Sequence, residues 1–342
     1  MVELNGKKIL VTFLMHLGDL TLTTPFIHAL RKAAPDAHIT MLVDEKLKDV
    51  VLFNPYLDEI VTIDKKGRDN SILSLWACSR HLSKLDFDVL INLHPNERCS
   101  FIDAMTKVKL RTGTTHKIFK WFWDVFTPLD RSMHAADMYL DVLQQLGVQD
   151  LSNNGLEIFP GEEHFLEAEL FWQEQNITDQ DKLIGFNIGS AVPTKRWPPE
   201  RFAEVADIFA ARGYKTVFFG GPMDEEMVAE ATGYMQTRPI IATGHFAIGG
   251  LAAAMRRCCL IITNDSGPMH VAISQKVPIV AMYGPSNPKL YGPYTKDAVI
   301  VTAQPPCQGC ADGMKHSCDD LQCMTMMTVE QVVEAADTML NK

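Results

Sequence analysis

The sequence lacks any long apolar run. Within its 342 residues, no stretch approaches the ~18 consecutive apolar residues that a membrane-spanning helix requires. The opening residues, MVELNGKK, also lack the basic and apolar regions of a secretory signal peptide. These absences argue against an integral membrane or exported protein, and we expect a cytoplasmic one.

A basic surface is also missing. The chain has 32 Lys and Arg against 42 Asp and Glu, a formal net charge of −10. Most of this excess lies after residue 160, where 14 basic residues face 22 acidic ones. Such a composition disfavours general nucleic-acid binding, because a phosphate backbone favours a basic surface. An anion bound by the second half must therefore be held by a few placed cations and backbone amides.

Short apolar segments alternate with helical segments along the chain, and the pattern starts twice. KKILVTFL, AHITMLV and FDVLINLH belong to the first half, and LIGFNIG, KTVFFGG and CLIITND to the second. This alternation is typical of βα units and a parallel sheet. We predict an α/β protein of two Rossmann-like domains, residues 1–160 and 161–342. The last segment, TVEQVVEAADTMLNK, has the apolar spacing of an amphipathic helix that could pack back across the join.

The segment CLIITNDSGPMHVA predicts a strand-to-helix turn. The strand runs into Asp265, and Ser266 then occupies the N-cap position of a helix. Gly267 lets a ligand approach the backbone, and the helix N-terminus favours an anion such as a diphosphate. His270, in the first turn, is expected to be a neutral hydrogen-bond donor. The alternatives are a capped helix without a ligand and a hydrolase triad, which the missing G-x-S-x-G elbow disfavours.

Two further loops carry candidate binding residues. In NIGSAVPTKRWPP, Ser190 and Thr194 precede Lys195, and small residues followed by a cation are typical of a phosphate site. The alternative is a pair of solvated loop charges. In FFGGPMDEE, a Gly-Gly turn precedes Asp224 at a helix start, where a carboxylate is also favoured by the helix dipole alone.

A carboxylate follows the first predicted strand. In ILVTFLMHLGDLTLTTP, Asp19 lies at the strand exit, and open α/β sheets bind ligands at the carboxyl ends of their strands. The alternative is that Asp19 caps the following helix, TLTTPFIHAL. His16 and His94 lie at or near strand exits in the same half and could line the same site.

These segments together resemble glycosyltransferase family 9, the ADP-heptose:lipopolysaccharide heptosyltransferases. The resemblance rests on ILVTFLMHLGDLTLTTPFIHALRKAAPDAHI, KRWPPERFAE, FFGGP, NDSGPMHVA and PIVAMYGPSNP, and it runs nearly from end to end. It implies a GT-B fold, in which two Rossmann-like domains with parallel sheets face across a cleft. It also implies inverting sugar transfer with no cofactor required for catalysis, from ADP-heptose or a related donor to a lipid-linked glycan.

The resemblance also implies residue roles. Asp19 matches the general base of the family's LGD motif. The residues that match the family's donor contacts are Ser190 or Thr194, Lys195, Asp265, Ser266, Gly267 and His270. Asp224 is a further candidate, as a substitute for a missing contact. Pro222 stands where close relatives have an acidic ribose-binding residue, so Asp224 or Glu225 would have to replace it and the preference for adenosine stays open. A nucleotide-sugar epimerase of the same fold and a non-catalytic binding protein remain alternatives.

The segment THKIFKWFWDVF mixes aromatic and basic residues. Lys117 and Lys120 lie among five aromatic residues, and Arg111 is close in sequence. Such a mixture suits an anionic, lipid-linked acceptor or peripheral contact with the inner face of a membrane. The alternative is an apolar helix of the first core, flanked by surface lysines.

Two patterns raise the question of a metal ion. Asp86 and Asp88 have the D-x-D spacing of metal-dependent transferases, but they directly precede a strand, and we interpret them as its polar entry. A cysteine cluster comprises Cys307, Cys310, Cys318 and Cys323. One prediction for this cluster is a set of free or redox-active thiols. The other is a structural zinc, with an iron–sulfur cluster as a further alternative.

Overall fold

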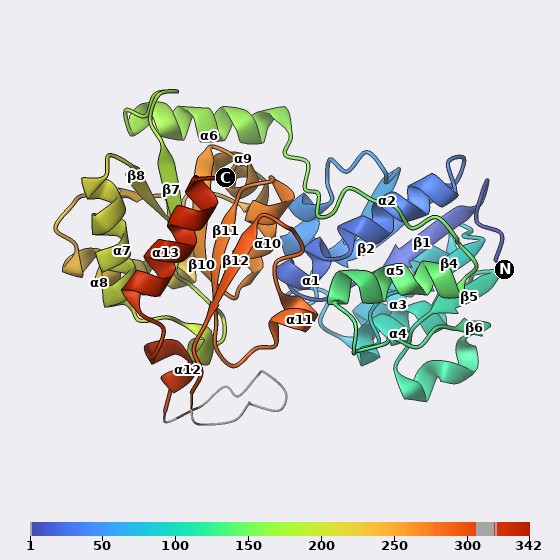
Figure 1. Ribbon diagram of the computed structural model, residues 1–342. Coiled ribbons are helices and arrows are strands. Elements are labelled where there is room, and N and C mark those ends of the chain that lie inside the picture. Colours follow the sequence, from blue (N-terminus) through green and yellow to red (C-terminus); the bar gives the residue numbers. More distant parts are fainter. Residues whose placement is uncertain (1, 306–317, 319) are drawn as a thin grey trace. The chain divides into compact units, whose positions relative to one another are not determined.

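The computed structural model describes residues 2–305, 318 and 320–342, which form two compact units (Figure 1). The first unit comprises Met1–Phe159 and the second Pro160–Lys342. In the described residues each unit is built around one six-stranded parallel sheet. No helix in the described part of the chain is long and apolar enough to cross a bilayer.

The first sheet has the strand order β3-β2-β1-β4-β5-β6. Its strands are, in that order, β3 (Glu59–Ile63), β2 (His38–Asp44), β1 (Lys8–Thr12), β4 (Val89–Asn92), β5 (Leu110–Gly113) and β6 (Val125–Phe126). In the register, Ile9 of β1 lies between Ile39 of β2 and Val89 of β4. The chain leaves β1 toward β2 and leaves β4 toward β5, so the ends of β1 and β4 form a topological switch point, where open α/β sheets bind ligands.

Helices cover the first sheet. The longer ones are α2 (Thr24–Ala33), α3 (Ile72–Ser83), α4 (Glu97–Met105) and α5 (Ala135–Gln145), and the shorter ones α1 (Leu17–Thr21), η1 (Glu45–Val50) and η2 (Lys117–Phe122). The helices α3 and α4 lie side by side, and their apolar residues join a core with Leu10, Leu42 and Leu90 of the sheet. Helices α2 and α5 pack against each other.

The second sheet has the order β12-β11-β10-β7-β8-β9. Its strands are, in that order, β12 (Ala298–Thr302), β11 (Ile279–Tyr283), β10 (Cys258–Asn264), β7 (Leu183–Asn187), β8 (Lys215–Phe219) and β9 (Ile240–Ile241). The chain leaves β7 toward β8 and leaves β10 toward β11, so these two neighbours form the switch point of this sheet.

The second unit repeats the layered arrangement. Its helices are α6 (Glu162–Glu174), α7 (Pro199–Ala211), α8 (Glu225–Tyr234), α9 (Ile248–Met255), α10 (Gly267–Ser274), α11 (Pro288–Tyr291), α12 (Gln322–Thr325) and α13 (Val329–Leu340), with the 3₁₀ helices η3 (Pro193–Lys195) and η4 (Pro222–Asp224). Apolar residues of α7, α8 and α13 form one core with Phe186, Ile262 and Val280 of the sheet. Helix α9 packs against α6 and α10.

The last helix, α13, forms where the sequence predicts it. A capping box starts it, because Thr328 Oγ1 accepts a hydrogen bond from Gln331 N and the Gln331 side chain accepts one from Thr328 N. The buried residues of this helix, including Val332 and Ala336, lie in the core of the second unit, against β10, β11, β12 and α7. That the helix could also pack back across the join stays a prediction.

The first core contains a buried carboxyl group beside the end of β1. Asp103 of α4 is fully buried, and its Oδ2 accepts a hydrogen bond of 2.8 Å from Thr12 Oγ1. Burial raises the pKa of Asp103 to about 8, against an ordinary value of 3.8. The carboxyl group is therefore largely protonated at neutral pH.

We predict that Asp103→Asn flattens the pH dependence of stability. Between pH 4 and 8 the folded protein keeps a proton on Asp103 that the unfolded chain releases. The free energy of unfolding therefore falls as pH rises, by up to about 1.4 kcal/mol per pH unit from this residue. Asparagine cannot ionise, so chemical denaturation at pH 5, 6.5 and 8 should show a smaller fall for the variant. An equal fall in both proteins would contradict the assignment.

Candidate functional site

The predicted phosphate-site residues gather at the switch point of the second sheet. Strand β7 ends at Asn187 and is followed by the loop that carries Ser190, Thr194 and Lys195. The neighbouring strand β10 ends at Asn264 and is followed by Asp265, Ser266 and helix α10. Both strands run in the same direction, so the two loops emerge at the same edge of the sheet.

Two asparagine side chains tie these loops together. Asn264 is fully buried, its Oδ1 accepts a hydrogen bond of 3.0 Å from Trp197 N, and its Nδ2 donates one of 2.6 Å to Ile188 O. Asn187 Nδ2 donates to Ser266 Oγ at 2.8 Å. Neither amide is predicted as a site residue from the sequence alone. The available signal was an asparagine as the last residue of each apolar strand.

Lys195 and Asp265 form an ion pair between the two loops. Lys195 Nζ lies 2.7 Å from Asp265 Oδ2, and the side chains are only 16% and 7% exposed. Ser190 Oγ donates to the backbone carbonyl of Asp265 at 3.4 Å. Burial and the nearby Asp265 carboxylate raise the pKa of Tyr283, which therefore stays a neutral phenol. The alternative that Lys195 is a solvated loop charge is wrong.

Helix α10 begins where the sequence predicts. Ser266 is its N-cap residue with extended backbone, Gly267 is the first helical residue, and a proline follows within the first turn. Ser266 does not cap the helix with its hydroxyl group, which instead accepts the hydrogen bond from Asn187. His270 is buried in the first turn. The N-terminal end of an eight-residue helix thus lies beside the Lys195–Asp265 pair.

Asp224 reaches the same loop from β8. It is the last residue of η4, and its Oδ2 accepts a hydrogen bond of 2.9 Å from Gly221 N. A Cβ atom at Gly189 would lie 2.1 Å from Asp224 Oδ1, so the glycine permits this close approach. Asp224 therefore lies against the loop that carries Ser190, and one of its carboxylate oxygens already accepts a backbone hydrogen bond.

In the first unit, Asp19 lies just beyond the end of β1. It is half-buried in the first turn of α1, whose N-cap residue is His16. Helix α2 begins separately at Thr24, with Thr23 as its N-cap residue. Asp19 therefore lies in a separate short helix and does not occupy the N-cap position of α2.

Two histidines flank the switch point of the first sheet. His16 follows β1 and is exposed, whereas His94 follows β4 and is buried. Burial, followed by the positive charges of Lys65 and His16, lowers the pKa of His94 to about 4. The His94 imidazole is therefore neutral at physiological pH.

The aromatic segment forms η2, a 3₁₀ helix with none of its residues buried. Trp121 is 95% exposed, and Ile118 and Phe122 are also exposed beside the exposed Lys117 and Lys120. The alternative of an apolar core helix is wrong, because within η2 only partly covered Phe119 packs inward, against Phe101 of α4.

Arg111 is used inside the first unit. It lies within β5, and its guanidinium group donates to the backbone carbonyls of Asp103 and Thr106 at the end of α4. The structure therefore does not place its side chain with Lys117 and Lys120 on the exposed η2 surface.

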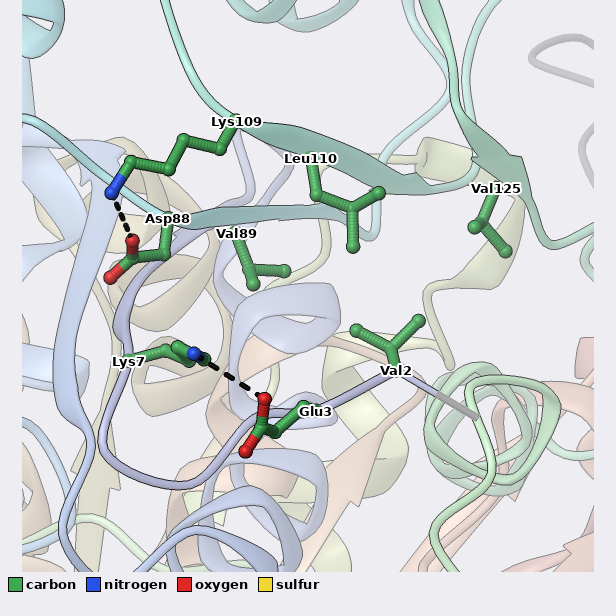
Figure 2. A pocket seen from close by; sticks show the side chains of 8 residues that line it. All are labelled: Val2, Glu3, Lys7, Asp88, Val89, Lys109, Leu110 and Val125. Atoms are coloured by element: carbon green, nitrogen blue, oxygen red, sulfur yellow. Dashed lines mark hydrogen bonds and ion pairs between the residues drawn. The ribbon is translucent and has the colours of Figure 1, made fainter.

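A hollow of about 430 Å³ opens at the amino-terminal edge of the first sheet, opposite to the strand ends discussed above (Figure 2). Its lining residues are Val2, Glu3, Lys7, Asp88, Val89, Lys109, Leu110 and Val125. Its charges pair with one another, Lys7 with Glu3 at 3.4 Å and Lys109 with Asp88 at 2.7 Å. Asp88 Oδ2 also accepts from Lys8 N, which confirms that the D-x-D pattern is a polar strand entry.

Half of the cysteine cluster lies outside the described residues. Cys307 and Cys310 belong to that part, while Cys318 is exposed and Cys323 is half-buried. No group of three potential metal-ligating side chains occurs among the residues that the structure describes. The structural zinc and the free thiols both stay predictions.

Comparison with known proteins decides the family. Residues 75–318 match "Glycosyltransferase family 9 (heptosyltransferase)". The chain belongs to glycosyltransferase family 9. It is similar to lipopolysaccharide heptosyltransferase 3 of Escherichia coli K12, with 26% identity over 82% of this chain and 84% of that protein.

Solved structures of this family agree. The glycosyl transferase family 9 structure from Veillonella parvula is 53% identical, with a TM-score of 0.95 and 99% coverage of both chains. The E. coli ADP-heptose lps heptosyltransferase II has 22% identity, a TM-score of 0.79 and 98% coverage of both chains, and shows the fold alone. The predicted α/β GT-B fold and glycosyltransferase activity are thus confirmed for this family 9 enzyme.

We predict that Asn264→Ala destabilises this glycosyltransferase by about 2–4 kcal/mol. The change leaves the buried Trp197 N–H and Ile188 carbonyl without their side-chain partner. Denaturant unfolding measures the effect, and Asn341→Ala at the exposed end of α13 is the control, expected to lie within about 0.5 kcal/mol of the parent protein. A loss below about 1 kcal/mol for Asn264→Ala would show that the loops do not depend on this amide.

Proposed function

We propose that the enzyme transfers a heptose or related sugar from an ADP-sugar to a lipopolysaccharide-core-type acceptor, with inversion and without a catalytic metal. The observation that carries the proposal is the ion pair of Lys195 and Asp265 beside the N-terminus of α10. A lysine and a helix N-terminus at the switch point of a parallel sheet are an arrangement that suits a diphosphate. The names of the relatives supply the sugar class.

Lys195 and the N-terminus of α10 bind the donor diphosphate. In the free protein Lys195 pairs with Asp265, and it can exchange part of that contact for phosphate oxygens. The positive end of the helix lies where negative charge grows as the diphosphate departs, which stabilises the leaving group. Glu225, exposed at the start of α8, is the better candidate for the ribose contact, because buried Asp224 already accepts from Gly221 N.

Asp19 acts as the general base. The acceptor hydroxyl oxygen attacks the anomeric carbon of the donor, and the bond from that carbon to the phosphate oxygen breaks. The nucleoside diphosphate leaves with the bonding electron pair, and Asp19 takes the proton of the hydroxyl group. A half-buried carboxylate at the switch point of the first sheet suits this role.

We predict that Asp19→Asn lowers the transfer rate by about 10²–10⁴-fold, because the isosteric amide cannot accept the proton. Binding of ADP, measured by calorimetry, should change less than about threefold, since the donor site is built by the second unit. The matched control is Asp130→Asn, a change of an exposed carboxylate in the same unit, which should keep full activity. Turnover retained by Asp19→Asn would overturn the assignment of the base.

The η2 surface, defined as Lys117, Ile118, Lys120, Trp121 and Phe122, contacts the membrane from which a lipid-linked acceptor is presented. Its two lysines can pair with anionic lipid headgroups. Its exposed aromatic residues can insert at the boundary between the headgroups and the acyl chains. Lys120 also lies over the ring of Phe126, with its Nζ 4.5 Å from the ring centroid. Such a contact with the membrane is peripheral and requires no membrane-spanning segment.

We predict that the double change Lys117→Ala and Lys120→Ala weakens binding to phosphatidylglycerol-containing vesicles by about 30-fold. Each lysine near an anionic surface contributes on the order of 1 kcal/mol. Sedimentation with vesicles at low salt measures the effect. Lys182→Ala with Lys215→Ala, two exposed lysines of the second unit, is the charge-matched control. Equal vesicle binding by the two double variants would exclude the η2 surface as the contact.

A further inference from the structure

Lys65 crosses the carboxyl edge of the first sheet to reach the loop that leads to Asp19. It lies two residues beyond the end of β3, and β2 separates that strand from β1. Its Nζ donates hydrogen bonds to the carbonyl oxygens of Leu14 at 3.0 Å and of Met15 at 2.7 Å. These two residues belong to the loop that joins β1 to His16, the N-cap residue of α1.

The third partner of the Lys65 ammonium group is Asp44, the last residue of β2. Lys65 Nζ lies 3.1 Å from Asp44 Oδ2, and the side chains are 12% and 7% exposed. Asp44 is itself held, because its Oδ1 accepts from Lys46 N. An ammonium group has three protons, and each has one partner here. Lys65 is therefore engaged within the fold and has no proton left for a ligand.

Arg98 holds the backbone of Lys65 and the segment that follows it. Arg98, at the start of α4, donates through Nη1 to the carbonyl oxygen of Lys65 and through Nη2 to Asn70 Oδ1 at 2.6 Å. Helix α4 follows β4, the other neighbour of β1. The segment after β3 is thus tied to the starts of both helices that follow the switch-point strands.

We propose that Lys65 is the positioning residue for Asp19, which it aims by fixing the carbonyl groups of Leu14 and Met15. The inference rests on the proposed role of Asp19 as general base. Leu20 N donates to His16 O at 2.9 Å, so the backbone just after Met15 starts the helical turn that contains Asp19. A loop that loses both carbonyl contacts lets that turn shift, and a misplacement of about 1 Å can cost about 10²-fold in rate.

The central test is a double-mutant cycle with Lys65→Met and Asp19→Asn. Methionine keeps most of the side-chain length and removes every donor. We expect Lys65→Met to lower kcat by about 10–100-fold and to leave the KM for the donor within about twofold. Because Lys65 acts through Asp19, adding Lys65→Met to Asp19→Asn should lower the residual rate less than about twofold further. Multiplied effects in the double variant would overturn the proposal.

Matched variants separate positioning from general stability. Lys109→Met breaks a lysine–aspartate pair of 2.7 Å at the opposite edge of the same sheet and should keep kcat within about twofold. Lys65→Arg, which can still donate to both carbonyls, should recover most of the rate. If Lys65→Met does not fold, Asp44→Asn replaces it, with an expected loss of about 3–10-fold. Calorimetric counting of ADP sites gives the folded fraction by which each rate is divided.

Two outcomes overturn the role of Lys65 without touching that of Asp19. One is a Lys65→Met variant in which kcat and both KM values are unchanged. The other is an unchanged kcat with a raised KM for the acceptor, which would make Lys65 a binding contact instead. Retained turnover in Asp19→Asn alone is different, because it removes the general base itself.

Discussion

Burial of both faces is the constraint on which the two sites depend. Strands such as β1 and β7 are apolar and covered on both sides, so a parallel sheet of this kind can place ligand-binding polar groups only at its strand ends. The chain starts each sheet in the middle and later returns to the opposite side of the first strand. This topology brings two strand ends with diverging loops together, once in each unit.

In each unit a buried lysine–aspartate pair connects neighbouring strands at the carboxyl edge of the sheet. Lys195 pairs with Asp265 between the loops after β7 and β10, and Lys65 pairs with Asp44 at the ends of β3 and β2. A buried ion pair adds little stability when its desolvation is counted, but it specifies which groups lie together. The two pairs differ in whether the lysine can still bind a ligand. Lys65 has all three protons engaged, whereas Lys195 lies beside a helix N-terminus that suits an anion.

The sequence predicts much of this arrangement because local patterns are strong at strand exits. A carboxylate directly after an apolar run marked Asp19, and a serine followed by Gly-Pro marked the start of α10. Lys65 could not be found in this way, since its partners in the exit loop lie 50 and 51 positions earlier. The exposure of the η2 surface could not be predicted for a different reason. Its aromatic density suits a core helix, but a 3₁₀ turn leaves Trp121 exposed and only the following Trp123 is buried, where its Nε1 donates to Thr112 O.

Thermal unfolding with nucleotides tests the proposal that the second unit binds the diphosphate of an ADP-sugar through Lys195 without a metal ion. A ligand that binds the native state raises Tm by mass action. We expect ADP in excess EDTA to raise Tm more than UDP or GDP does, and Lys195→Met to lose most of this shift. A shift that appears only with Mg²⁺, a shift with UDP alone, or an undiminished shift in Lys195→Met would overturn the metal-free ADP site at Lys195.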